Sequence, residues 1–474
     1  MQPLPTLPKF LRTFLDITAG WRLAFDQDRT HQRAVRQAIA GLCCGDRHTM
    51  TGVILSLGAG GRDWSADYRL HSRSRWRAEE LFKPVIERAH PHCGRKYVAV
   101  AFDDTKVRKT GTRVPGAGWW ADPLGPKFQV QLLWGLRFLQ ASVLAPEYMR
   151  GGSAARGLPV AFTEVPAVKR PRRSAPQEEH AAYRNAVREN NLSTAFGRQV
   201  ADLRAQLDAT GAKRKLLIAT VDGSFCNRTS MCIDIDRVVI VARARRDAKL
   251  CAPSTEGRRT YDPVKFTPEA VRHDPGILWK TAKVFHGKRE RTVRHKEVGP
   301  VLWQGGTGPR KVRLIVLAAT RYKRRGQNRK RPYYRQAAYL LATDLTTSAR
   351  VLIQKYFDRW QIEVNHKEEK DTLGVGEAQL RSAQSVPRQP ALCVAAYSAL
   401  VLAAMLAHGP KRTAAYNTLP KWYEGVGRPT ARDMVALLRH ETSTAIAQTQ
   451  AIDPLRTLIA TQIGHVPRRA NVQT

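Results

Sequence analysis

Two short and almost continuously apolar segments constrain the fold more than any other feature of this sequence. They are residues 97–105 (YVAVAFDDT) and 215–222 (KLLIATVD). Runs of this kind are typical of strands that are buried on both faces, as in α/β sheets. Each run ends in acidic residues, and the ends of core strands are a usual place for catalytic carboxylates in α/β proteins. Aspartate is also common in the turns that follow strands, so position alone leaves both interpretations open.

A segment further along the chain is predicted to form a helix that carries several chemical groups on one face. Ser348 can cap this helix, and the segment contains neither proline nor glycine before Gly374. An arc of about 60° on its surface holds the side chains of Tyr356, Arg359, Glu363 and Lys370. A separate apolar stripe, which we expect to anchor the helix on a core, consists of Ile353, Phe357, Trp360 and Val364.

The polar face of this helix has two interpretations. A solvated helix with an Arg359–Glu363 ion pair would have the same pattern, and such pairs contribute only roughly 0.2–0.5 kcal/mol. Alternatively, Glu363 ligates a metal together with Asp222 and an aspartate of the Asp103–Asp104 pair. Carboxylates without cysteine or histidine partners suit Mg²⁺ or Mn²⁺. Two such ions catalyse phosphodiester displacement in many enzymes.

The charge of the chain indicates a polyanionic partner. The 474 residues include 79 Lys and Arg against 40 Asp and Glu, which gives a net charge of +39. Nucleic acid is the leading candidate. An anionic membrane would require an amphipathic or lipidated anchor. The one long apolar run, residues 391–407, has 17 residues and is interpreted as a buried helix, so we expect no membrane partner.

The cysteines and the N-terminus indicate a cytoplasmic protein. The seven cysteines are scattered and form no CxxC pair, which argues against a disulfide framework and against a zinc site. The first ten residues, MQPLPTLPKF, lack the charged segment and apolar core of a signal peptide. Together with the net charge, these features predict a cytoplasmic, nucleoid-associated location.

Segments with other patterns complete the organisation. Residues 127–145 are predicted as two strands that break near Gly135, residues 150–176 as a loop, and 177–207 as a helix with a candidate interruption at Gly197. The basic and aromatic run 321–335 (RYKRRGQNRKRPYYR) suits backbone contact and base stacking, although charge runs are usually solvated surface. The predicted parts are a helical, DNA-binding domain at 1–92, a core at 97–245 and 337–408, a basic insertion subdomain at 246–336 and a helical C-terminal region at 409–474.

The spacing of Tyr356, Arg359, Glu363 and Lys370 matches the YREK signature, and the chain resembles bacterial insertion-sequence DDE transposases on this motif. The DDT that ends the first apolar run and the segments ATDL and YFDRWQIE around the helix are similar to the same family. The resemblance covers roughly residues 97–385. It implies an α/β fold with an RNase H-like catalytic core and a β-rich insertion, between an N-terminal helical domain and a helical C-terminal tail.

The resemblance also implies roles for individual residues. Asp104, Asp222 and Glu363 would bind two Mg²⁺ or Mn²⁺ ions. Asp104 is preferred over Asp103 because the family's aspartate directly precedes the threonine. The residues that would contact DNA are Tyr356, Arg359 and Lys370, at the backbone of the transposon end, and Trp303, by stacking on a flipped base.

The activity that the resemblance implies is metal-dependent cleavage at transposon ends and strand transfer into target DNA, by a cut-and-paste route. The protein would act as a homodimer on double-stranded DNA, because paired cleavage of two ends needs two active sites. Two alternatives stay open: a catalytically silent or domesticated DNA-binding protein, and a stand-alone two-metal DNA nuclease.

Overall fold

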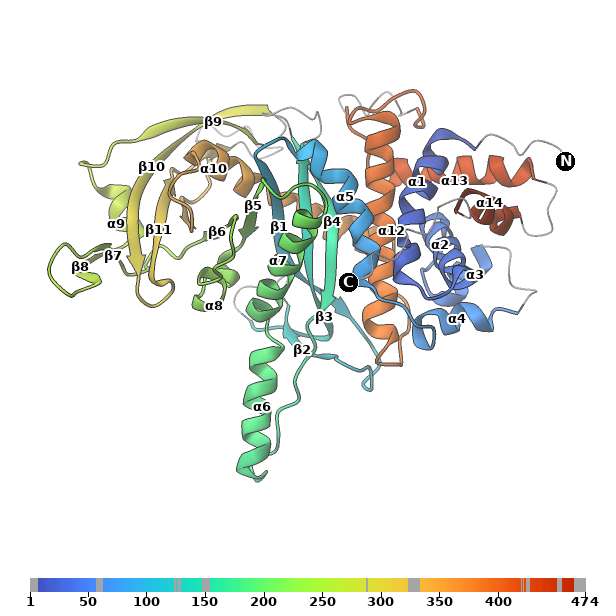
Figure 1. Ribbon diagram of the computed structural model, residues 1–474, viewed down its shortest axis with the longest axis horizontal. Coiled ribbons are helices and arrows are strands. Elements are labelled where there is room, and N and C mark those ends of the chain that lie inside the picture. The colour runs from blue at the N-terminus through green and yellow to red at the C-terminus, as the bar shows by residue number, and fades with distance from the viewer. Residues whose placement is uncertain are drawn as a thin grey trace.

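Figure 1 shows a computed structural model of the chain. The structure describes residues 7–56, 63–122, 125, 129–146, 154–286, 289–322, 333–418, 420, 422, 427–449 and 454–463. These residues form one large mixed sheet, with helices on both of its faces and a group of helices beside it. The expected α/β class is therefore confirmed.

Three parallel strands form the centre of the sheet. They are β1 (Tyr97–Arg108), β5 (Leu216–Val221) and β6 (Val238–Arg243), which lie next to one another in that order. β3 (Leu132–Pro146) pairs antiparallel with β1, and β4 (Ala155–Glu164) pairs with the other edge of β3. Both of the apolar runs predicted as core strands, β1 and β5, are confirmed. This mixed order is consistent with an RNase H-like domain.

Beyond β6, the sheet continues with β14 (Ala338–Ala342), from the segment predicted as the second part of the core, and then with strands from the predicted insertion at 246–336. β14 pairs with β6, β11 (Gly308–Leu317) pairs with the other side of β14, and β10 (Arg289–Trp303) follows β11. The basic run predicted at 321–335 lies mostly outside the described residues. The remaining strands are β2 (Gly118–Ala121), β7 (Leu250–Pro253), β8 (Tyr261–Phe266), β9 (Lys280–His286), β12 (Arg321–Tyr322) and β13 (Tyr333–Tyr334).

Helices cover the two faces of the central strands. α7 (Leu192–Ala209) packs on the face that carries Phe102. α10 (Ala349–Asp358) and α11 (Trp360–Asp371) pack on the opposite face. They form the helix predicted after Ser348, separated only at Arg359, whose backbone stays helical with φ −49° and ψ −32°. Trp360 does not anchor this helix as expected, because 59% of its surface is exposed.

The helices beside the sheet come from both ends of the chain. α12 (Ser385–His408) is, among the described residues, the one helix long and apolar enough to cross a membrane, and most of it is buried inside the protein. It packs against α1, α2 and β4, as expected for a core helix. The other helices are α1 (Lys9–Ala19), α2 (Asp28–Cys43), α3 (Met50–Ser56), α4 (Ser65–Ser72), α5 (Lys83–Ala89), α6 (Gln177–Glu189), α8 (Arg228–Met231), α9 (Pro268–His273), α13 (Ala431–Ala447), α14 (Pro454–Ile463) and the 3₁₀ turns η1 (Gly20–Ala24), η2 (Glu79–Phe82), η3 (His90–Cys93) and η4 (Gly223–Phe225).

Two sequence predictions about breaks in elements were wrong. β3 continues through Gly135 without a turn. Glycine is needed there because the backbone of β1 comes very close: a Cβ on Gly135 would lie 2.2 Å from the carbonyl oxygen of Val107. The long helix expected over 177–207 is interrupted at Asn190 and Asn191, where the Asn191 side chain caps α7, and not at Gly197. Residues predicted as loop also include the strand β4.

We predict that Gly135→Ala destabilises the protein by about 1–3 kcal/mol, because the added methyl group would collide with backbone that cannot move without breaking the β1–β3 pairing. The measurement is the midpoint of thermal or urea unfolding. Gly41→Ala in α2 is the matched control. It adds the same group where no atom lies within 4 Å, and it should be neutral or stabilising by up to about 1 kcal/mol. Equal midpoints for the two variants would contradict the steric explanation.

Candidate active site

The two strand-end aspartates lie side by side on adjacent strands. Ala101 of β1 pairs with Thr220 of β5, so Asp103 and Asp222 are each two residues further along their strands. Asp222 directly follows β5, and its side chain accepts hydrogen bonds from the amide (2.8 Å) and hydroxyl (2.6 Å) of Ser224. The fold therefore brings the ends of the two apolar runs to one edge of the sheet.

Asp103 and Asp104 point to opposite faces of β1, because side chains alternate along a strand. Asp103 shares the face of Ala99 and Ala101, which belong to the core beneath α10 and α11. Gln140, the residue opposite Asp103 on β3, faces the same way, since its amide donates a hydrogen bond of 2.9 Å to Glu369 of α11. The face toward α11 is therefore the face of Asp103.

Arg359 joins Asp103 to Glu363. Its Nη1 lies 3.2 Å from Oδ2 of Asp103, and its Nη2 lies 3.2 Å from Oε1 of Glu363. The guanidinium carbon is 5.9 Å from the centre of the Tyr356 ring, at the distance of a cation–π contact. The ion pair with Asp103 is the better shielded of the two, since the Arg359 and Asp103 side chains are 13% and 18% exposed, whereas that of Glu363 is 34% exposed. One cation thus holds two carboxylates from distant parts of the sequence.

Negative charge is concentrated at this edge beyond what Arg359 neutralises. Burial raises the pKa of Asp103 to about 7; Arg359 opposes this effect, and the charges of Asp222 and Asp104 add to it. Burial also raises the pKa of Glu363, with Arg359 lowering it and the charge of Asp222 raising it. The charge of Asp222 therefore destabilises the ionised forms of both Asp103 and Glu363, an effect that is typical of carboxylates at a cation site before the cation binds.

Asp104 has different neighbours. Its Oδ2 lies 3.8 Å from Nζ of Lys106, and its charge also acts on Arg137 and on Lys370 at the end of α11. The structure brings Asp103, and not Asp104, to Arg359 and Glu363. The preference for Asp104 as the first metal ligand is untested, and the geometry favours the alternative that the sequence left open.

The other predicted contact residues lie at different distances from this edge. Tyr356 packs beside Arg359, and Lys370 is solvent-exposed at the end of α11. Trp303 ends β10, and the turn that follows folds back over its ring, where a Cβ on Gly306 would lie 2.0 Å from a ring carbon. That turn contacts Cys232, and not the carboxylates. The structure does not bring Trp303 to the site, and its stacking role stays a prediction.

The carboxylates of the site suit a hard cation such as Mg²⁺, but in this structure their side chains do not surround a common point where such a cation could bind. Within the part of the chain that the structure describes, no three His, Cys, Asp or Glu residues converge closely enough to hold a metal ion. Arg359 lies between Asp103 and Glu363 instead. A donor set made only of carboxylate oxygens would fit Mg²⁺ or Mn²⁺ if the guanidinium moved aside.

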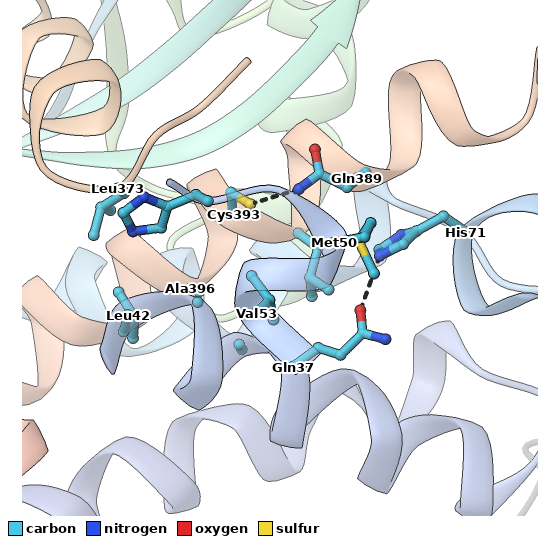
Figure 2. A pocket seen from close by; sticks show the side chains of 13 residues that line it. Gln37, Leu42, Met50, Val53, His71, Leu373, Gln389, Cys393 and Ala396 are labelled. Carbon is cyan, nitrogen blue, oxygen red and sulfur yellow. Dashed lines mark hydrogen bonds between the residues drawn. The ribbon is translucent and has the colours of Figure 1, made fainter. Parts of the chain in front are cut away.

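An apolar pocket lies elsewhere, between the N-terminal helices and α12. Figure 2 shows that its labelled residues come from α2, α3, α4 and α12, with Leu373 from the segment that follows α11, and include Gln37, His71, Gln389 and Cys393. His71 Nε2 lies 3.0 Å from the Gln37 side-chain oxygen, and burial lowers the pKa of His71 to about 3. A neutral histidine bonded to an amide is a structural feature of a core, so this pocket is not part of the candidate site.

Comparison with known protein families identifies one match. The family model described as DDE superfamily endonuclease matches residues 23–310, which is more than half of the chain. The matched range includes Asp103, Asp104 and Asp222, whereas Glu363 lies beyond its end. No curated protein matches the chain.

We predict that Asp103→Asn stabilises the metal-free protein at pH 8 and has little such effect near pH 4. Folding raises the pKa of Asp103 from 3.8 to about 7, so ionisation of this carboxyl group increasingly opposes folding as the pH rises through that interval. An amide removes this effect. The measurement is the thermal midpoint in EDTA at both pH values, with Asp104→Asn on the opposite face as the control. A loss of stability in Asp103→Asn that is equal at pH 4 and pH 8 would contradict the prediction.

Proposed function

The chain belongs to the DDE superfamily of endonucleases, and we propose that within this family it is a transposase that cuts DNA at transposon ends and transfers the strands into target DNA. Membership implies a nuclease with a DNA substrate, and the family generally uses divalent metals. The observation that carries the finer proposal is the Arg359 bridge. It joins Glu363 of the Tyr356–Lys370 motif to Asp103, beside Asp222.

Asp103, Asp222 and Glu363 are the residues that would hold two Mg²⁺ or Mn²⁺ ions. When bound, such ions activate the attacking oxygen and stabilise the leaving oxygen of a phosphodiester. We choose Asp103 over Asp104 because Arg359 already brings Asp103 and Glu363 together. Asp104 pairs with Lys106 instead and would act indirectly.

Arg359 has two successive roles in this proposal. Before DNA arrives, it offsets the repulsion that Asp222 exerts on Asp103 and on Glu363 at a partly buried site. Once released from the two carboxylates, the guanidinium would be available for a phosphate, which guanidinium groups bind in a planar, bidentate geometry. Tyr356, next to it, limits the directions in which Arg359 can turn.

Lys370 and the basic surface serve the substrate more generally. Lys370 lies exposed at the end of α11, about two helical turns from Glu363, where it can contact the backbone of the transposon end. The net charge of +39 supports the same substrate, because each neutralised phosphate releases counterions. A homodimer on two ends and a cytoplasmic, nucleoid-associated location complete the proposal.

We predict that Glu363→Gln and Asp222→Asn each reduce metal-dependent cleavage by about a hundredfold or more, because each removes a metal ligand worth several kcal/mol of transition-state stabilisation. DNA binding should remain. The assay uses duplex DNA with the element's own ends, in Mg²⁺ or EDTA. Asp103→Asn and Asp104→Asn form the matched pair at the first position, and Asp103→Asn should be the more severe. Wild-type binding without cleavage, in Mg²⁺ and in Mn²⁺, would favour a catalytically silent DNA-binding protein.

We also predict that pre-cleaved ends with a free 3′-hydroxyl are joined to a target plasmid by the wild-type protein and not by Glu363→Gln. Hydrolysis and strand transfer differ only in the attacking oxygen, so one site can catalyse both. Joined products would be detected by sequencing the junctions. Cleavage of the ends without any joined product would identify a stand-alone nuclease instead.

A further inference from the structure

A projecting arm lies between β4 and α7. We define the arm as residues 165–191; it consists of an outgoing segment, 165–176, and the helix α6 that returns. No residue of α6 is buried. Figure 1 shows α6 extending away from the sheet, below α7. The outgoing segment runs alongside it, since Lys169–Ala175 and the α6 residues Glu179, Ala182, Tyr183 and Ala186 line one shallow pocket.

The base of the arm is held firmly. The Asn191 side chain accepts a hydrogen bond from the amide of Thr194 and donates one of 2.6 Å to the carbonyl oxygen of Arg188. The Thr194 hydroxyl donates a second bond, of 2.8 Å, to the same carbonyl. These contacts fix the angle between α6 and α7, so the arm has a defined direction.

This base lies at the edge of the sheet where the two apolar runs end, next to Asp103 and Asp222. We call this edge the catalytic edge. Phe196, in the second turn of α7, contacts Phe102, which precedes Asp103, and Phe225, which follows Asp222 by three residues. Ser193 and Asn227 are hydrogen-bonded as well. The outgoing segment begins after Glu164 of β4. Glu164 pairs with Phe138 of β3, and Phe138 pairs in turn with Thr105 of β1, two residues after Asp103. Both ends of the arm therefore leave the fold beside the two aspartates.

The charges of the arm are exposed and unpaired. Among the described residues, none of its basic side chains forms an ion pair, and all are exposed. Arg184 and Arg188 lie one turn apart on the side of α6 away from the pocket, and the other four belong to the outgoing segment. The arm also carries three carboxylates, whose negative charges offset part of this positive charge: Glu178, Glu179 and Glu189. The basic residues are Lys169, Arg170, Arg172, Arg173, Arg184 and Arg188.

We propose that the arm binds the backbone of the duplex that enters the catalytic edge. This inference rests on the proposed function only in taking DNA as the substrate. A helix of 13 residues without tertiary packing is marginally stable in water, and a partner that pairs with its cations would stabilise it. α6 is about 20 Å long, which corresponds to about six phosphates along one strand at 3.4 Å each. A second copy of the arm fits less well, because like charges would face each other.

The test replaces Lys169, Arg170, Arg172 and Arg173 with Gln and measures the affinity for a 40-base-pair duplex in EDTA at several salt concentrations. If all four residues contact phosphates, the slope of log affinity against log salt should fall by about three to four. Arg184→Gln with Arg188→Gln should reduce it by up to about two. The charge-matched control replaces Arg95, Lys96, Lys213 and Arg214, which are exposed just before the first residues of β1 and β5, at the opposite end of these strands from the aspartates, and should change the slope by less than one.

The outcomes separate the arm from the proposed function. Wild-type binding with an unchanged slope in both arm variants would overturn this inference and leave the proposed function intact. The inference would also be overturned if an arm variant lost self-association, measured by sedimentation, but kept the wild-type salt dependence of DNA binding. That result would indicate that the arm binds a second copy of the chain. If the wild-type protein binds no duplex at all, the inference and the proposed function both fail. Circular dichroism and thermal midpoints establish that the variants fold, which the exposure of the replaced residues favours.

Discussion

The pair of ion bridges from Arg359 is the interaction on which the candidate site depends. Asp103 and Glu363 lie far apart in the sequence, and both are partly buried. Removing water from two carboxylates that face a third is unfavourable unless a cation stands between them. Arg359 provides that cation from the one residue that separates α10 from α11. The site is therefore assembled around a positive charge even before any metal binds.

The helix that carries Glu363 is positioned by polar contacts as much as by apolar ones. Ile362 is its one described apolar residue that is fully buried. Asn365 donates hydrogen bonds to the carbonyl of Gly157 on β4 and to the Tyr397 hydroxyl of α12. A Cβ at Gly157 would lie 2.3 Å from the Asn365 side-chain oxygen, so the glycine permits this approach. With Glu369 bonded to Gln140, three elements fix the direction in which Glu363 points.

Much of the fold could be predicted from local patterns, and the exceptions have physical causes. The central strands were evident because both faces are buried, which leaves an unbroken apolar run. β4 was missed because its arginine, glycine and proline suggest a loop, yet Arg156 is buried and donates to the carbonyl of Pro429. Gly135 suggested a turn because the local sequence does not show that the backbone of Val107, on the neighbouring strand, lies against it. Trp360 fitted the apolar stripe, but no neighbouring element covers that position in the described chain.

In the candidate site, too, some features could be predicted from the sequence, whereas others depend on contacts between distant segments. Spacing along a helix placed Arg359 next to Glu363, since both lie within one helical turn. Choosing between Asp103 and Asp104 required knowing which face of β1 meets α11, and a strand buried on both faces gives no such signal. That choice is set by Ala99 and Ala101, small residues that let α10 and α11 pack closely on one face while Phe102 fills the other against Phe196. The size of the alternating core residues thus determines which aspartate meets the arginine, and the chemistry of the edge follows from the packing beneath it.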